Sequence, residues 1–69
     1  MSATLRVNGE DRRLEVATVL ELLRAEGLDP ARRGLAVALN GAVVRRADWP
    51  EAALSPGDEV EIVKPFAGG

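Results

Sequence analysis

Residues 18–27 read TVLELLRAEG, and this stretch decides the fold because it has the pattern of one complete amphipathic helix. Thr18 fits the N-cap and Glu21 the third helical position of a capping box. Gly27 fits a left-handed residue just past the C-terminus. The apolar residues follow the i, i+3, i+4 spacing of a stripe that faces a core: Val19, Leu22 and Leu23. The sequence therefore predicts a helix over residues 19–26.

A β-hairpin is predicted on the N-terminal side of this helix. Residues 5–7 alternate apolar and charged side chains, as a half-buried strand does. Asn8-Gly9 follows at once, and this dipeptide is the strongest short signal for a tight hairpin turn. Residues 12–16 then alternate again, so the two segments should pair as antiparallel strands.

A second hairpin is predicted after the helix. Residues 35–39 form a short apolar run, which we expect to be a central strand covered on both faces. Asn40-Gly41 is another hairpin signal. Residues 42–44 should therefore return as the next strand.

The last part of the chain is predicted to contain a helical turn and a final strand. Residues 49–54, which begin with Trp49-Pro50, should form the short turn of helix. Residues 55–58, Ser-Pro-Gly-Asp, are typical of a tight turn. Residues 59–63 alternate glutamate with valine or isoleucine and should form the strand. Pro65 ends it because proline has no N–H to donate to a sheet.

The predicted order is β-β-α-β-β-β, with one main helix near the start. A helix between the second and third strands must cross one face of the sheet and bury its apolar stripe there. We therefore expect an α+β fold of the β-grasp, or ubiquitin-like, type, with a mixed sheet of four to five strands and the helix packed on it. Residues 1–65 should form this single domain, and residues 66–69 a flexible C-terminal tail.

The composition excludes most catalytic and metal-binding arrangements. The 69 residues include no Cys, His or Tyr, so a nucleophile paired with an imidazole base cannot be built. A structural zinc site would have to use carboxylates alone, which is rare. An enzyme with only carboxylates would need a deep cleft, which a domain of this size rarely forms. We expect no catalytic residue and no metal.

Charge and hydropathy limit the partners. Nine basic and eleven acidic residues give a net charge of −2, whereas nucleic-acid-binding proteins usually carry a basic excess. Three arginine pairs, at residues 12–13, 32–33 and 45–46, are interpreted as solvated turns and strand edges, with docking of an acidic partner as the alternative. The longest apolar run, Leu35 to Leu39, is too short for a membrane span or a signal core. We expect a soluble, cytoplasmic protein that binds neither nucleic acid nor membrane.

The chain stops at Ala67-Gly68-Gly69, directly after the predicted final strand. Glycine has no Cβ, so two terminal glycines can lie extended, turn at positive φ and pass through a channel too narrow for side chains. This ending suits a terminal carboxylate that enters the active sites of other proteins and is activated there. A terminus without a function is the alternative.

The ordered set of motifs resembles the ThiS family, the sulfur carrier proteins of thiamine (thiazole) biosynthesis. The hairpin and capping motifs are generic, but their order ahead of a terminal Gly68-Gly69 is specific and covers nearly the whole chain. The matching segments are residues 7–10 (VNGE), 18–23 (TVLELL), 27–28 (GL), 37–41 (VALNG), 43–45 (VVR), Trp49, Leu54, 57–63 (GDEVEIV) and 68–69 (GG).

The resemblance implies a carrier mechanism in which the chain itself binds no cofactor. An adenylyltransferase of the ThiF type, similar to ubiquitin-activating enzymes, would use ATP and Mg to adenylate the carboxylate of Gly69. Sulfur from a donor such as a cysteine desulfurase would displace AMP and leave a thiocarboxylate. A thiazole synthase of the ThiG type would accept this sulfur. The chain would be a covalent co-substrate and not an enzyme, and Gly68 and Ala67 would thread into the partner sites.

Four further residues are candidates for partner contacts. Trp49 is interpreted as core packing, with an exposed docking contact as the alternative because Trp is enriched at binding hot spots. Phe66 lies beyond the last predicted strand, where it enters a partner's channel or packs back on the sheet. Glu59 and Glu61 should share one exposed face, which is either simply solvated or meets a basic rim around the partner's channel and steers docking.

Three other functions remain open from the residues. Pro65 and Phe66 before Ala67 are similar to the small subunit of molybdopterin synthase, a sister sulfur carrier. A ubiquitin-like protein modifier has the same fold and ending, although Lys64 is the single lysine and modifier chains need acceptor lysines. The third is an interaction domain whose Gly-Gly has no role, and such a domain alone would tolerate deletion of Gly69.

Overall fold

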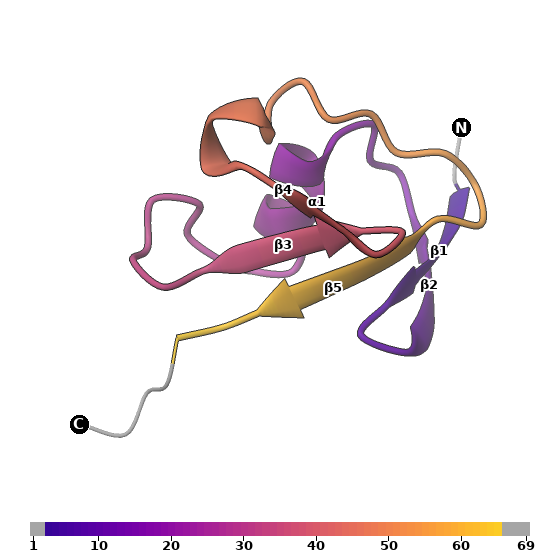
Figure 1. Cartoon of the computed structure of the whole chain (residues 1–69). Coiled ribbons are helices and arrows are strands. Elements are labelled where there is room, and N and C mark those ends of the chain that lie inside the picture. Colours follow the sequence, from indigo (N-terminus) through magenta and orange to yellow (C-terminus); the bar gives the residue numbers. More distant parts are fainter. Residues whose placement is uncertain (1–2, 66–69) are drawn as a thin grey trace.

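Five strands, one α-helix and one short 3₁₀ helix form in residues 3–65, the part of the chain that this computed structural model describes (Figure 1). In chain order the elements are β1 (Ala3–Val7), β2 (Glu10–Leu14), α1 (Val19–Ala25), β3 (Ala36–Leu39), β4 (Ala42–Val44), the 3₁₀ helix η1 (Arg46–Asp48) and β5 (Glu59–Val63). The predicted succession of two strands, a main helix and three strands is confirmed.

The strands form one mixed sheet in the order β2-β1-β5-β3-β4. β1 runs parallel to β5, and the other neighbouring strands are antiparallel. β5 therefore lies in the middle of the sheet although it comes last in the sequence. α1 packs on one face of the sheet (Figure 1). This is the β-grasp arrangement that the element order predicts.

Both predicted hairpins are confirmed, although β2 spans Glu10–Leu14 and not the predicted residues 12–16. Both turn in the same way. Asn8 and Gly9 have φ of 51° and 81°, and Asn40 and Gly41 have φ of 49° and 84°. Positive φ at both central residues is typical of the type I′ turn, whose twist matches that of the strands it joins. Asparagine tolerates this conformation better than other residues with a side chain because it can hydrogen-bond locally.

The start of α1 is capped by Thr18, as predicted. Its Oγ1 accepts a hydrogen bond from the N–H of Glu21 at 3.2 Å. The Glu21 carboxylate accepts from the N–H of Ala17 at 2.8 Å, one residue earlier than in a standard capping box. The helix ends at Ala25, one residue before its predicted end, and Gly27 follows with φ of 76°, the left-handed conformation expected there.

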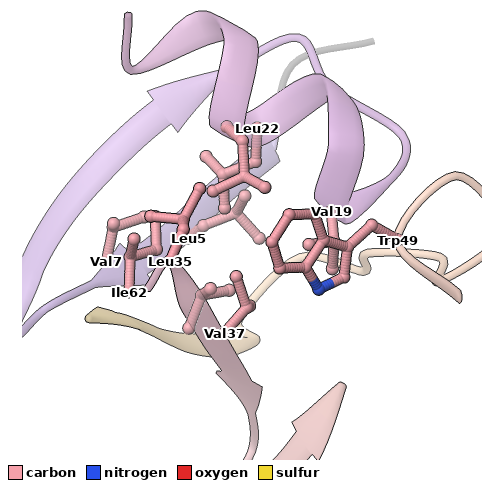
Figure 2. Packing of buried hydrophobic residues seen from close by; sticks show 10 residues of the cluster. Leu5, Val7, Val19, Leu22, Leu35, Val37, Trp49 and Ile62 are labelled. Atoms are coloured by element: carbon pink, nitrogen blue, oxygen red, sulfur yellow. The ribbon is translucent and has the colours of Figure 1, made fainter. Parts of the chain in front are cut away.

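The core lies between α1 and the inner face of the sheet (Figure 2). Val19, Leu22 and Leu23 are 0% exposed, so the predicted stripe is the face of α1 that the sheet covers. Each such side chain contributes about 1.5–3 kcal/mol when it is fully buried. The buried set is Leu5, Val7, Val19, Leu22, Leu23, Leu35, Val37, Trp49, Val60 and Ile62.

The prediction that residues 35–39 are covered on both faces is wrong. Val37 of β3 is 2% exposed, but its neighbour Ala36, which points to the other face, is exposed. The run is apolar throughout because its outward residues, Ala36 and Ala38, are alanines. An alanine side chain is small enough to face water at little cost in free energy. The sheet therefore has one packed face and, within residues 3–65, one open face.

The predicted helical turn over residues 49–54 is confirmed only in its first half. The 3₁₀ helix η1 comes directly before Trp49, and the N–H groups of Glu51 and Ala52 continue its turn by donating to the carbonyl of Asp48 at 3.0 and 2.8 Å. Beyond this turn the prediction is wrong, because Ala53 forms an isolated antiparallel bridge with Thr18. The N–H of Val19 donates to the carbonyl of Ala52 at 2.9 Å. Because the first N–H groups of a helix have no partner inside it, this segment satisfies one of them by adopting extended backbone.

Candidate functional site at the end of β5

β5 carries the chain from the middle of the sheet to Pro65, the last described residue. It places Val60 and Ile62 in the core, where they are 1% and 7% exposed. The alternate side chains point to the open face of the sheet: Glu59, Glu61 and Val63. Because β1 and β3 pair with β5 on its two sides, the residues that follow start from a supported strand and not from a free edge.

An apolar patch lies on the open face of the sheet beside the end of β5. Val63 is 60% exposed and Val43 is 80% exposed. The strand register places Ala36 opposite Val63 and Ala38 opposite Val43, so these four side chains, called the outer patch below, adjoin one another. Exposed apolar surface bordered by polar residues is typical of sites that contact other proteins.

Glu59 and Glu61 lie on this same open face and are exposed, as the alternation in the sequence predicts. The nearest cation of Glu59 is Arg6, whose Nη1 lies 4.0 Å from a Glu59 carboxylate oxygen. A second long pair joins Arg6 Nε to Asp11 at 4.0 Å. Such exposed pairs contribute little stability, so the carboxylates remain available to a partner.

A shallow hollow of about 220 Å³ lies on the open face of the sheet between β1 and β5. Its volume is below the roughly 300–1,000 Å³ of sites that enclose small molecules. This face is therefore better suited to contact with a protein than to binding a metabolite. The hollow is lined by Arg6, Gly9, Glu59, Val60 and Glu61.

The polar residues in the described part of the chain are all at least partly exposed. Within residues 3–65 no charged or polar residue is buried, and no three carboxylates gather in a way that could hold a metal ion. In the same part of the chain, no helix has the length and apolar character needed to cross a bilayer.

Trp49 is part of the core, which supports the first of its two interpretations. Its ring is 2% exposed and lies beside Val19 and Val37 (Figure 2). Its indole N–H donates to the carbonyl of Val44 at 3.0 Å, and the guanidinium of Arg46 lies 4.7 Å from the ring centroid. A ring enclosed in this way presents no surface for a docking contact.

The other predicted site residues lie outside the described part of the chain. Phe66, Ala67, Gly68 and Gly69 follow Pro65. Their roles as channel contact, threading segment and adenylation site stay predictions.

Two contacts that sequence reasoning missed hold residues 62–65, called the tail root below. The Asn8 side chain bonds both backbone groups of Ile62. Gly34 packs so closely on Pro65 that a Cβ at residue 34 would lie 2.9 Å from the Pro65 Cβ. The Asn8-Gly9 dipeptide predicts a turn from local sequence alone. The contact of Asn8 with Ile62, 54 residues away, depends on the tertiary fold and has no local signal.

Comparisons with known proteins agree on one family. The model of the ThiS family matches residues 5–69. A protein of Thermus thermophilus named sulfur carrier protein ThiS is 38% identical over 63 residues, which are 91% of this chain and 95% of that protein.

Two solved structures of a thiamine biosynthesis protein (ThiS) of Geobacter metallireducens are also similar. Its crystal structure has a TM-score of 0.76 and 33% identity, over 96% of this chain and 99% of that chain. A solution structure of the Geobacter metallireducens thiamine biosynthesis protein has a TM-score of 0.77 and 32% identity, over 96% of this chain and 87% of that chain. The similarity thus includes sequence, fold and length.

Proposed function

This chain belongs to the ThiS family, and from that premise we propose that it is a sulfur carrier protein of thiamine biosynthesis that carries sulfur on the carboxylate of Gly69. The observation that carries the proposal is the family match, which runs through to residue 69 and so includes Gly68-Gly69. The fold agrees with it, because β5 leads from a supported position in the sheet toward those residues.

The proposed chemistry activates a carboxylate that is otherwise a poor electrophile. An adenylyltransferase of the ThiF type uses ATP and Mg to join AMP to the Gly69 carboxylate, with pyrophosphate as leaving group. A persulfide that a desulfurase forms from cysteine then displaces AMP through its terminal sulfur, and a thiol cleaves the resulting acyl disulfide, which leaves a thiocarboxylate on Gly69 and a disulfide. This group is ionised near neutral pH because its charge is shared with the carbonyl, so it is a nucleophile when it reaches a thiazole synthase of the ThiG type.

In this proposal the chain is a co-substrate, and the catalytic groups belong to its partners. The family supports this division, because the relative in Thermus thermophilus is named a sulfur carrier protein. The family and the thiamine biosynthesis neighbours favour thiamine over the molybdopterin and protein-modifier alternatives.

The direct test is to incubate the protein with a ThiF-type enzyme, ATP, Mg and a cysteine-derived sulfur source. We expect the intact mass to rise by the difference between one sulfur and one oxygen atom, and fragmentation to place the change on Gly69. The loaded protein should then support product formation by a thiazole synthase but not by the large subunit of molybdopterin synthase. Sulfur found on any internal residue would refute the proposal.

We further propose that the open face of the sheet docks on the activating enzyme. The outer patch supplies exposed apolar area that includes Val63 of the tail root, and Glu59 and Glu61 add negative charge on the same face. Complementary charge across an interface mainly raises the rate of association. These carboxylates would therefore steer the chain toward a basic rim of the partner's channel.

Glu61→Lys should lower kcat/KM for adenylation about tenfold at low salt, because it reverses the charge beside the outer patch. The loss should shrink as salt is added, since ions screen exposed charges beyond about 10 Å at 0.1 M ionic strength. Initial rates across a salt series measure both effects. Glu51→Lys makes the same change of charge at an exposed residue in the connection after η1 and should alter the rate less than twofold. Equal losses in the two variants would show that net charge matters and this face does not.

A further inference from the structure

We propose that Asn8 and Gly34 are positioning residues that fix the tail root, residues 62–65, and so determine where the last residues of the chain start. The inference deepens the proposed function and rests on it, because a fixed starting point matters only if Gly69 must reach a partner's active site. The two residues contact the tail root from opposite sides, Asn8 from the β1–β2 turn and Gly34 from the segment that precedes β3.

Asn8 replaces a strand neighbour that the sheet lacks. The parallel pairing of β1 with β5 includes Arg6 with Glu59 and Val7 with Val60, and the N–H of Asn8 donates to the carbonyl of Val60 at 2.9 Å. The chain then turns away into β2. The next peptide groups of β5 on that side, those of Ile62, would have no strand beside them.

The Asn8 carboxamide satisfies both of those groups. Its Oδ1 accepts from the N–H of Ile62 at 2.7 Å, and its Nδ2 donates to the carbonyl of Ile62 at 3.2 Å. A carboxamide has the donor and acceptor of a peptide group, so Asn8 extends the sheet by one residue without a strand. Because Ile62 is 7% exposed, water is a poor substitute for this partner.

Asn40 makes the comparable contact at the other end of β5. It also occupies the first position of an Asn-Gly turn with positive φ. Its Oδ1 accepts from the N–H of Glu59 at 2.9 Å, and its Nδ2 donates to Asp58 at 3.1 Å. Asn8 and Asn40 are thus the same residue type in the same type of turn, and both bond to β5. They differ in that Asn8 bonds at the tail root and Asn40 at the opposite end of the strand, so Asn40 is a matched control.

Gly34 holds the tail root by shape. Pro65 has no N–H to donate to the sheet, so packing has to place it. A Cβ at residue 34 would lie 2.9 Å from Pro65 Cβ and 3.6 Å from Pro65 Cα, close enough to displace the ring. Gly41 has nearly the same φ, 84° against 82°, but a Cβ there would meet nothing within 4 Å. Alanine at either residue is strained by φ, but it moves Pro65 only at residue 34.

A fixed tail root matters because the proposed function places the reacting carboxylate on Gly69, only four residues after Pro65. Four extended residues span at most roughly 14 Å. A shift of the tail root by a few ångströms is a large fraction of that reach. A mobile tail root also increases the conformational freedom that is lost when the partner captures the tail, so the effect should appear in KM more than in kcat.

The test compares Asn8→Gly with Asn40→Gly, and Gly34→Ala with Gly41→Ala. Glycine adopts the positive φ of these turns without strain, so the first pair removes only the side chains. In the free protein, hydrogen exchange of the Ile62 and Val63 amides should quicken at least about tenfold in Asn8→Gly and Gly34→Ala, through local opening. It should change little in the two control variants, and melting curves would show that all four fold.

The second readout is the ATP–pyrophosphate exchange catalysed by the ThiF-type enzyme. We expect Asn8→Gly and Gly34→Ala to lower kcat/KM about tenfold, mainly through KM, as misplacement of a reacting group does. The control variants should stay within about twofold of the wild type. The alternative is that each test variant and its control lose kcat/KM in the same proportion to their loss of melting temperature. That result would overturn the positioning role, because the residues would then act through stability alone.

The two readouts also separate this inference from the proposed function. If the wild-type chain is not adenylated at all, the proposed function fails and the catalytic consequence of the tail root fails with it. The hydrogen-exchange measurement uses the free protein, so it still decides whether Asn8 and Gly34 hold residues 62–65. Unchanged hydrogen exchange of the Ile62 and Val63 amides in both variants would overturn that part, whatever the enzyme assay shows.

Discussion

A chain with one alanine added after Gly69 will fold as the wild type does and will accept no sulfur. The added residue moves the carboxylate about 3.3–3.6 Å along the tail and puts a Cβ where the proposed channel admits only backbone. The buried residues of the described core lie between Leu5 and Ile62, so we expect the added residue to leave the contacts among them in place. Intact-mass measurement after incubation with the ThiF-type enzyme, ATP and sulfur source should show no sulfur gain.

Deletion of Gly69 and an alanine added before Met1 complete this experiment. The deletion leaves a glycine carboxylate, but one residue too close to the tail root, and we expect it to abolish loading as well. The N-terminal addition should load normally, since it does not alter the tail. Normal loading of the chain extended after Gly69 would rule out the terminal carboxylate as the sulfur site.

Trp49→Ala should unfold a large part of the population. Loss of a buried Trp side chain costs about 3–5 kcal/mol, whereas a domain of 69 residues has in total about 3–10 kcal/mol of folding stability. The ring also contacts Arg46, whose guanidinium donates to the carbonyls of Pro30 and Arg32, so its removal loosens the loop before β3. Urea unfolding followed by far-ultraviolet circular dichroism measures the loss.

Trp49→Phe is the matched comparison. It keeps an aromatic ring in the core and loses the indole N–H that donates to Val44, so we expect a smaller loss of stability. Adenylation by the folded Trp49→Phe protein should match that of the wild type, because the ring is 2% exposed. A large loss of kcat/KM at unchanged stability would instead support the docking interpretation of Trp49.

The sequence predicts the elements whose signals are local. The type I′ turns follow from Asn8-Gly9 and Asn40-Gly41, and the extent of α1 follows from Thr18 and Gly27, because each signal lies in the residues that adopt the conformation. The alternation of residues 59–63 also predicts correctly that Glu59 and Glu61 are exposed.

The errors and omissions have long-range causes. The helical turn at 49–54 stops early because Ala52 and Ala53 bond to the start of α1, more than thirty residues earlier in the sequence. Nothing in the sequence near Arg46 indicates that its guanidinium donates to the carbonyls of Pro30 and Arg32, in the loop before β3. Asn8 and Gly34 belong to the same class, since their partners Ile62 and Pro65 adjoin them only after the sheet has assembled.

The central place of β5 also governs when a newly made chain can fold. Within residues 3–65, the hairpin of β1 and β2 and the hairpin of β3 and β4 share no pairing and are joined only through β5. The ribosome makes β5 after all the other strands, and pairings so distant in sequence form late. A nascent chain therefore lacks the strand that joins its two hairpin segments until β5 has been made. Products of translation that stops before β5 would lack the joining strand and expose unpaired strand edges, which makes such species prone to aggregation.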